Sequence, residues 1–250
     1  MKKGLWITVL LFWAVTLAGC FAFTEPEAST GAVVAPTLAP VVEAEPTDPA
    51  SEPTEAPVAA ATAVPEQETS TADPAIYEID PARSEARFTI EEVLRGSDKT
   101  VVGVSSNLAG QIAFDMNDPA ATQIGEILIN ARDFATDNNF RNRAIANEIL
   151  LTNTHEFITF VPKELVGLPD SAVIGETYDF QIIGDLTIIG ETREVTFDAT
   201  VIPTSESELQ GLASTTILYG DFGVTVPLSQ AVSAVNEDVL LELDFVAVAQ

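Results

Sequence analysis

The sequence has one cysteine and one histidine, which limits its chemistry. With Cys20 as the only cysteine, no intrachain disulfide can form, so the folded part must depend on its own core. A lone histidine, His155, cannot supply the nitrogen ligands of a typical zinc site. With Cys20 acylated as argued below, no cysteine is left to pair with it as a nucleophile, and a surface or loop-packing role is commoner for a loop histidine. Glycine-rich phosphate loops and dinucleotide fingerprints are also missing. We therefore expect no enzyme, no metal and no cofactor, although carboxylates distant in sequence could still meet in space.

Basic residues are scarce as well. The 250 residues include 11 Lys and Arg against 38 Asp and Glu, for a formal net charge of −27. Such a chain repels phosphate backbones, which argues against nucleic acid as a partner. It equally disfavours attachment to an anionic leaflet through a polybasic patch. Solubility outside the cytoplasm is the simplest role for this much negative charge.

The first twenty residues resemble the signal of a bacterial lipoprotein. Lys2 and Lys3 precede an uncharged apolar run over 5–17, which is shorter than the roughly 20 residues of a spanning helix. The run ends in Leu17-Ala18-Gly19-Cys20, which is similar to a lipobox. The resemblance implies cleavage after residue 19 and acylation of Cys20, with the protein lipid-anchored outside the cytoplasm, on the periplasmic or cell-surface side of the cell membrane. The alternative is an ordinary secretory signal with an incidental cysteine.

The composition then divides the chain into three parts. Residues 1–19 are the predicted signal peptide, 20–74 the acylated cysteine and a stalk, and 75–250 a folded domain. Between Thr24 and Pro74 the chain is rich in Pro, Ala, Thr and Glu and contains no aromatic and no basic residue. Such a segment buries too little apolar surface to offset its ordering entropy. We expect a disordered, extended tether.

From residue 75 onward, apolar and polar residues alternate as in half-buried strands. Phe88 and Ile90 alternate with polar residues over 84–94, and Leu243 and Phe245 do so near the C-terminus. Strands without intervening helices favour an antiparallel sheet, and closure into a barrel removes its edges. The exceptions are residues 137–151, which suit a short amphipathic helix or lid with Asp137 as N-cap, and a second helical turn near 229–235. We predict an all-β fold with one or two short helices.

The domain also resembles the YceI-like family of polyisoprenoid-binding proteins. The most specific match is Gly184-Asp185-Leu186-Thr187-Ile188-Ile189-Gly190-Glu191-Thr192, and others lie at 77–81, 88–90, 110–115, 136–142, 157–160 and 221–224. The resemblance implies an extended, eight-stranded, antiparallel lipocalin-like β-barrel with a long isoprenoid in its interior. Two departures are Asn142-Arg143-Ala144 after Arg141, where the family often has Asp-x-His, and His155-Glu156, where it tends to have Tyr-Pro.

Strand phase then gives candidate lining residues for that interior: Phe88, Ile90, Ile112, Phe114, Ile127, Ile129, Phe180, Ile182, Leu186, Ile188, Phe197, Leu243 and Phe245. By periodicity alone these side chains could equally fill a solid core. A diphosphate head group would need a cation, and Arg141 and Arg143 lie beside Phe140 in the predicted lid. Alternatively, both arginines pair with nearby carboxylates.

Two functions follow from these observations. The first is a lipid-anchored envelope protein that stores or transports an isoprenoid-type lipid, such as a polyprenyl lipid or a quinone. The second is a solid scaffold lipoprotein that binds a protein partner. The sequence leaves a homodimer open.

Overall fold

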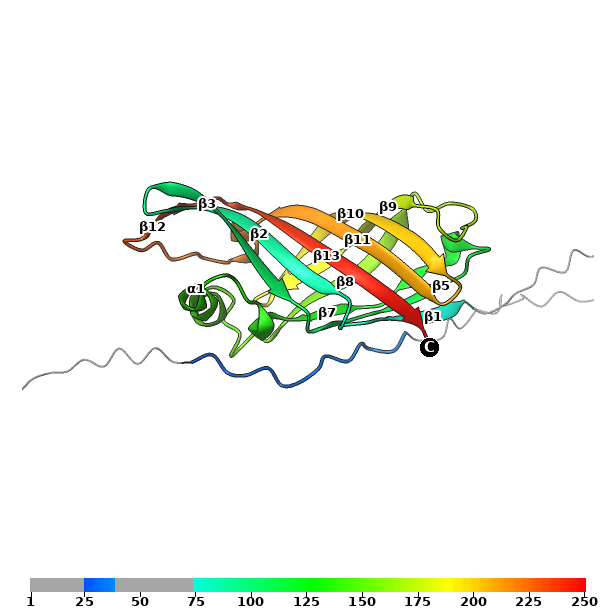
Figure 1. Cartoon of the computed structure of the whole chain (residues 1–250), viewed down its shortest axis with the longest axis horizontal. Helices are drawn as coiled ribbons and strands as arrows, with labels where there is room; N and C mark the ends of the chain where they lie inside the picture. The colour runs from blue at the N-terminus through cyan, green and yellow to red at the C-terminus, as the bar shows by residue number, and fades with distance from the viewer. Residues whose placement is uncertain (1–24, 39–73) are drawn as a thin grey trace, which may run out of the picture.

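Thirteen strand segments form one curled antiparallel sheet in the computed structural model, which describes residues 25–38 and 74–250 (Figure 1). In chain order they are β1 (Ala75–Ile79), β2 (Glu85–Leu94), β3 (Ser97–Ser105), β4 (Leu108–Ala109), β5 (Gln111–Phe114), β6 (Gln123–Ile124), β7 (Ile127–Asn130), β8 (Phe157–Val166), β9 (Tyr178–Ile188), β10 (Glu191–Ser205), β11 (Glu208–Leu218), β12 (Val232–Val235) and β13 (Asp238–Ala249). The predicted all-β, antiparallel, lipocalin-like class is confirmed.

The strand count differs from eight because several strands bend. β1 and β2 both pair with β13, on either side of a bend over 80–84. The next stretch of chain bends twice: β3 pairs with β2, β4 with β7 and β5 with β1. Through β4 and β5 the sheet curls back on itself, which places the inward faces of β1, β5, β7, β8, β9, β10, β11 and β13 around a shared interior.

The one α-helix among the described residues lies in the predicted interval but starts later. α1 (Asn139–Ala144) continues into a π-helical turn, η3 (Ile145–Ile149). The N-cap is Asn138, whose side chain accepts hydrogen bonds from the amides of Phe140 and Arg141, so Asp137 was the wrong residue. Asp137 instead forms ion pairs with Lys99 and Arg141. Short 3₁₀ turns are η1 (Pro119–Ala121), η2 (Ala131–Asp133) and η4 (Tyr219–Phe222).

The second helical turn, predicted near 229–235, is wrong. Val232–Val235 forms β12, which pairs with the end of β2. Two β-branched residues in four suit an extended strand, and the free edge of β2 supplies the backbone partners. Among the described residues, no helix is long and apolar enough to cross a membrane.

Part of the predicted tether lies against the sheet. Residues 25–38, which we name the strap, run alongside the molecule from the α1 end toward β1 (Figure 1). The strap makes hydrogen bonds to Asn107, Gln111, Arg132 and Glu156, and its own Ala35 is buried. The prediction of disorder is therefore wrong for these residues, because composition does not reveal polar partners supplied by a distant surface. Cys20 and residues 39–73 lie outside the described residues.

Candidate lipid-binding interior

An apolar inner cavity of about 140 Å³ lies in the barrel interior. Aliphatic and aromatic side chains from β1, β5, β7, β8, β9, β10, β11 and β13 form its walls. The polar residues on its lining are Arg87, Thr122, Thr200 and Glu242, of which Arg87 and Glu242 pair with each other at 3.4 Å. A mainly apolar cavity of this size has room for a small apolar group.

A larger outer cavity of about 520 Å³ lies at the α1 end. Its walls come from β2, β3, β13, α1, η3 and the segment that leads into β12. Ile145 and Ile149 face it from η3, while Val101 and Val239 face it from the sheet. The volume falls within the range of small-molecule sites.

The two cavities adjoin. Phe134, Ile158, Ile188 and Leu241 line both, so we call these four side chains the junction. The Phe134 ring packs edge-on against Phe88, with ring centroids 5.4 Å apart. The junction is entirely apolar. A hydrocarbon chain at the junction would therefore contact only apolar side chains and would desolvate no polar group there.

All thirteen residues assigned to the lining by strand phase border these cavities. Phe88 and Ile90 border the outer cavity, Ile188 borders both, and the rest border the inner one: Ile112, Phe114, Ile127, Ile129, Phe180, Ile182, Leu186, Phe197, Leu243 and Phe245. The structure thus brings the predicted residues together. Their contact with a ligand remains a prediction.

Three glycines lie directly against aromatic side chains that border the cavities. A Cβ on Gly103 would lie 2.1 Å from the Phe88 ring, and one on Gly211 would lie 2.6 Å from the Phe245 ring. On Gly184, the first residue of the family motif, a Cβ would lie 2.5 Å from the carbonyl oxygen of Val161 and 2.7 Å from the Phe160 ring. Each glycine therefore leaves room for a lining aromatic ring close to the backbone of the sheet.

Arg141 lines the outer cavity and is already paired. Its guanidinium donates to Glu92 at 2.7 Å and also forms an ion pair with Asp137. The side chains of Arg141 and Glu92 are 15% and 8% exposed, so water screens the pair weakly. The hydrogen bond from Lys99 lowers the pKa of Asp137 below its ordinary value. Partial burial acts in the opposite direction, and Arg141 lowers this pKa further. The positive charge at this mouth is therefore balanced by two carboxylates.

The other two predicted mouth residues differ in position. Phe140 borders the outer cavity and is 70% exposed. Arg143 does not border either cavity; its guanidinium lies 6.0 Å from the centre of the Phe140 ring and 3.9 Å from Glu25 of the strap. Arg143 is therefore placed beside the rim and not in the lining.

Strand phase missed lining residues of two kinds. Phe160 and Leu241 follow the same alternation as their predicted neighbours and could have been found by it. Phe134 and Ile145 lie outside regular strands, and Val226 and Leu228 lie in an irregular segment. No local periodicity marks these positions, because tertiary packing alone turns them toward the cavity.

The described residues contain no group of three or more His, Cys, Asp or Glu side chains placed to hold a metal ion. His155 lies in the loop before β8, against Gly190.

Comparison with known proteins fits this geometry. A family model described as the YceI-like domain matches residues 77–247. The chain belongs to the YceI-like family. A UPF0312 protein of Staphylococcus epidermidis is 25% identical over 135 residues, which is 54% of this chain and 70% of that protein.

Two solved structures share the fold. BcnA of Burkholderia cenocepacia is 20% identical with a TM-score of 0.54, over 67% of this chain and 98% of its own. A polyisoprenoid binding domain from Saccharophagus degradans, implicated in plant cell wall breakdown, is 13% identical with a TM-score of 0.55, over 71% of this chain and 99% of its own. At these identities the likeness establishes the fold alone.

Proposed function

We propose that this protein binds one long isoprenoid-type lipid across the inner and outer cavities, and that it holds the lipid at the cell envelope while anchored through acylated Cys20. The observation that carries the proposal is the apolar junction between two adjoining cavities. The polyisoprenoid binding domain with the same fold supports the class of ligand. The lipobox-like sequence supports the anchor.

Apolar burial supplies enough free energy for such binding. Each buried CH₂ contributes about 0.8 kcal/mol, so a five-carbon isoprene unit contributes roughly 4 kcal/mol before ordering costs. Association and loss of chain freedom offset much of this. Several units would therefore be needed, and the adjoining cavities provide an elongated apolar path for them.

The mouth favours a head group without strong charge. A diphosphate would have to compete with Glu92 and Asp137 for Arg141, in a chain of net charge −27. A quinone or a free polyprenol meets no such competition. We therefore place quinones and neutral polyprenyl lipids ahead of polyprenyl diphosphates.

The test compares head groups at constant tail length. The chain from Cys20 onward is incubated with a quinone, a polyprenol and a polyprenyl diphosphate of equal isoprenoid length, and native mass spectrometry counts bound lipid. We expect one lipid per chain for the quinone or the polyprenol, with weaker binding of the diphosphate. Binding of none of the three would refute the carrier function. It would favour the alternative of a scaffold that binds a protein partner.

A further inference from the structure

The strap is held on the barrel wall by a series of hydrogen bonds to specific side chains. The amide and hydroxyl of Thr30 donate to Glu156 Oε1 at 2.9 and 2.8 Å. Asn107 contacts the strap backbone twice: its Nδ2 donates to the Gly31 carbonyl at 2.9 Å, and its Oδ1 accepts from the Val33 amide at 2.9 Å. Further along, the Leu38 amide donates to Gln111 Oε1 at 3.0 Å.

The wall side of this surface is buried and charged. Arg132, whose side chain is 8% exposed, donates to the Ala28 carbonyl at 3.0 Å, and it forms ion pairs with Glu27 at 3.1 Å and Glu156 at 3.2 Å. Burial alone would raise the pKa of Glu156, but hydrogen bonds from Thr30 and Asn130 and the charge of Arg132 lower it. Glu156 therefore stays ionised as an acceptor for the strap.

The strap begins at the end of the molecule that carries the outer cavity. Glu25 lies 3.9 Å from Arg143 of α1. Two lining residues of the outer cavity, Phe140 at 70% and Leu228 at 62%, are exposed large apolar side chains, and we call them the rim. Figure 1 shows α1, the segment leading into β12 and the start of the strap at the same end.

Chain length then relates the rim to the anchor. Glu25 follows Cys20 by five residues, which span at most about 17 Å. Without the docked strap, 55 residues separate Cys20 from Ala75, and even a flexible coil of that length averages about 40 Å end to end. Docking therefore shortens the tether to less than half of that length and selects which end of the barrel lies next to the anchor.

We propose that the docked strap holds the Phe140–Leu228 rim against the bilayer surface, so that the outer cavity opens toward the membrane. This inference rests on the proposed anchoring through Cys20. Apolar contact suits the rim because the strongly acidic chain cannot rely on anionic lipid heads. A lipid could then pass between bilayer and cavity without crossing open water.

The orientation can be tested with a single introduced tryptophan, because the part of the chain from Cys20 onward contains none. Trp6 and Trp13, the only tryptophans, precede Cys20, so the chain from Cys20 onward has none and carries a single thiol. That chain contains every described residue. Its thiol is coupled to a maleimide lipid in phosphatidylcholine vesicles with brominated acyl chains, which quench tryptophan that enters the bilayer surface.

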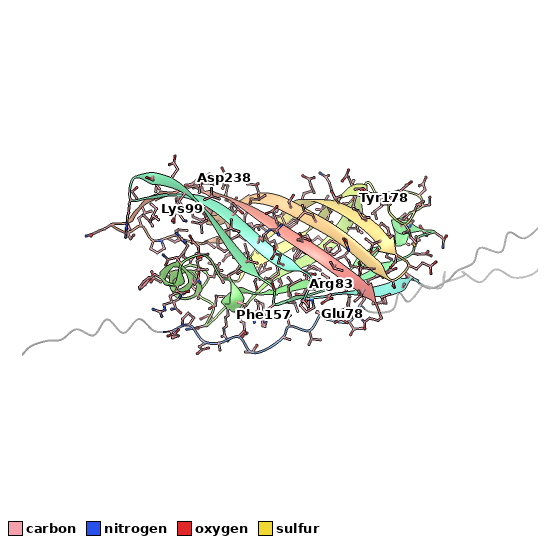
Figure 2. All side chains as sticks on the ribbon, in the orientation of Figure 1. Glu78, Arg83, Lys99, Phe157, Tyr178 and Asp238 are labelled. Carbon is pink, nitrogen blue, oxygen red and sulfur yellow. The ribbon has the colours of Figure 1, made fainter. Side chains whose placement is uncertain are left out.

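Two tryptophan variants then report the orientation. Phe140→Trp places the probe on the rim. Val173→Trp places it on a residue that is 53% exposed and bonded through its amide to Tyr178, which Figure 2 shows at the opposite end from Lys99. We expect a blue shift and quenching for Phe140→Trp and neither for Val173→Trp. Equal quenching at both positions, or none at either, overturns the proposal.

A matched pair of double variants tests the strap itself. Thr30→Pro with Val33→Pro removes two amide donors and a hydroxyl. Val34→Pro with Thr37→Pro makes the same changes at residues that form no hydrogen bond with the described residues. In the Phe140→Trp background, the first pair should lose the quenching and the second should keep it. Retention by both overturns the role of the strap.

Different results would refute the anchor through Cys20 and the membrane-facing orientation of the outer cavity. The mass of the protein isolated from its own membranes shows whether Cys20 carries acyl chains, and an unmodified cysteine refutes the anchor. The maleimide coupling still reports the orientation in that case. A rim that stays unquenched on the coupled chain refutes the membrane-facing cavity, whatever the state of the native cysteine.

Discussion

At the scale of single residues, the space around Gly184 explains why the family motif begins with a glycine. Gly184 lies where any side chain would meet the carbonyl oxygen of Val161 at 2.5 Å and the Phe160 ring at 2.7 Å. Gly184→Ala should therefore destabilise the fold by about 1–3 kcal/mol, as overpacking usually does. Chemical denaturation measures this directly. Gly220→Ala, where a Cβ meets nothing within 4 Å, is the control and should change little.

A second residue-scale prediction concerns Glu208. Hydrogen bonds from Arg83, then Gln210 and Thr204, lower its pKa from 4.5 to about 2. The folded state therefore gains stability above pH 4.5, and loses that gain as the pH falls toward 2. Arg83→Met should raise the pKa of Glu208 toward its ordinary value.

Carboxyl NMR titration of the two proteins checks this prediction. Arg193→Met, which removes an exposed arginine 3.6 Å from Glu191, should leave the Glu208 titration in place. If Glu208 titrates normally in the unaltered protein, the role assigned to Arg83 is wrong.

At the scale of elements, α1 and η3 cover one side of the outer cavity. Asn138 accepts from two amides of the first turn, and loss of such a cap costs about 0.5–2 kcal/mol. Asn138→Ala should thus increase amide hydrogen exchange across 140–149 without unfolding the sheet. Asn139→Ala, a change at an exposed neighbour with no side-chain hydrogen bond to the described residues, should not. Equal exchange in both variants would contradict the assigned cap.

The sequence predicted the strands better than the elements between them. Alternation in 84–94 placed Phe88 and Ile90 on the inward face of β2, because a half-buried strand has a period of two. Alternation could not predict the strand at Val232–Val235, because its conformation depends on the edge of β2. It could not predict the docked strap either, because the partners Asn107, Arg132 and Glu156 lie far along the chain.

At the scale of the whole molecule, the length of the bound lipid should depend on the junction. Leu241→Trp fills the space between the cavities, so a long-tailed quinone should lose about tenfold or more in affinity, whereas a short-tailed one still fits the outer cavity. Calorimetric titration with both quinones measures the difference. Leu240→Trp, at the adjacent residue on β13 with 36% exposure, should bind both as the unaltered protein does. Equal loss for both tail lengths would show that the cavities do not act together.

Whether the interior is hollow could not be decided from alternation, because a core and a cavity wall have the same period. The glycines at 103, 184 and 211 leave room beside the sheet for aromatic rings that border the cavities, and alternation does not reveal this. The balanced charge of Arg141 was equally hidden, because Glu92 approaches it from a separate strand.

Lipid binding is tested by lipid extraction from the protein purified out of its own membranes, combined with native mass spectrometry of the same sample. We expect one long isoprenoid-type lipid per chain, released by organic solvent, and a lower occupancy in the Leu241→Trp variant. A chain whose native mass is that of the polypeptide and its acyl groups alone, and which stays so after incubation with long-tailed quinone and polyprenol, would contradict this expectation.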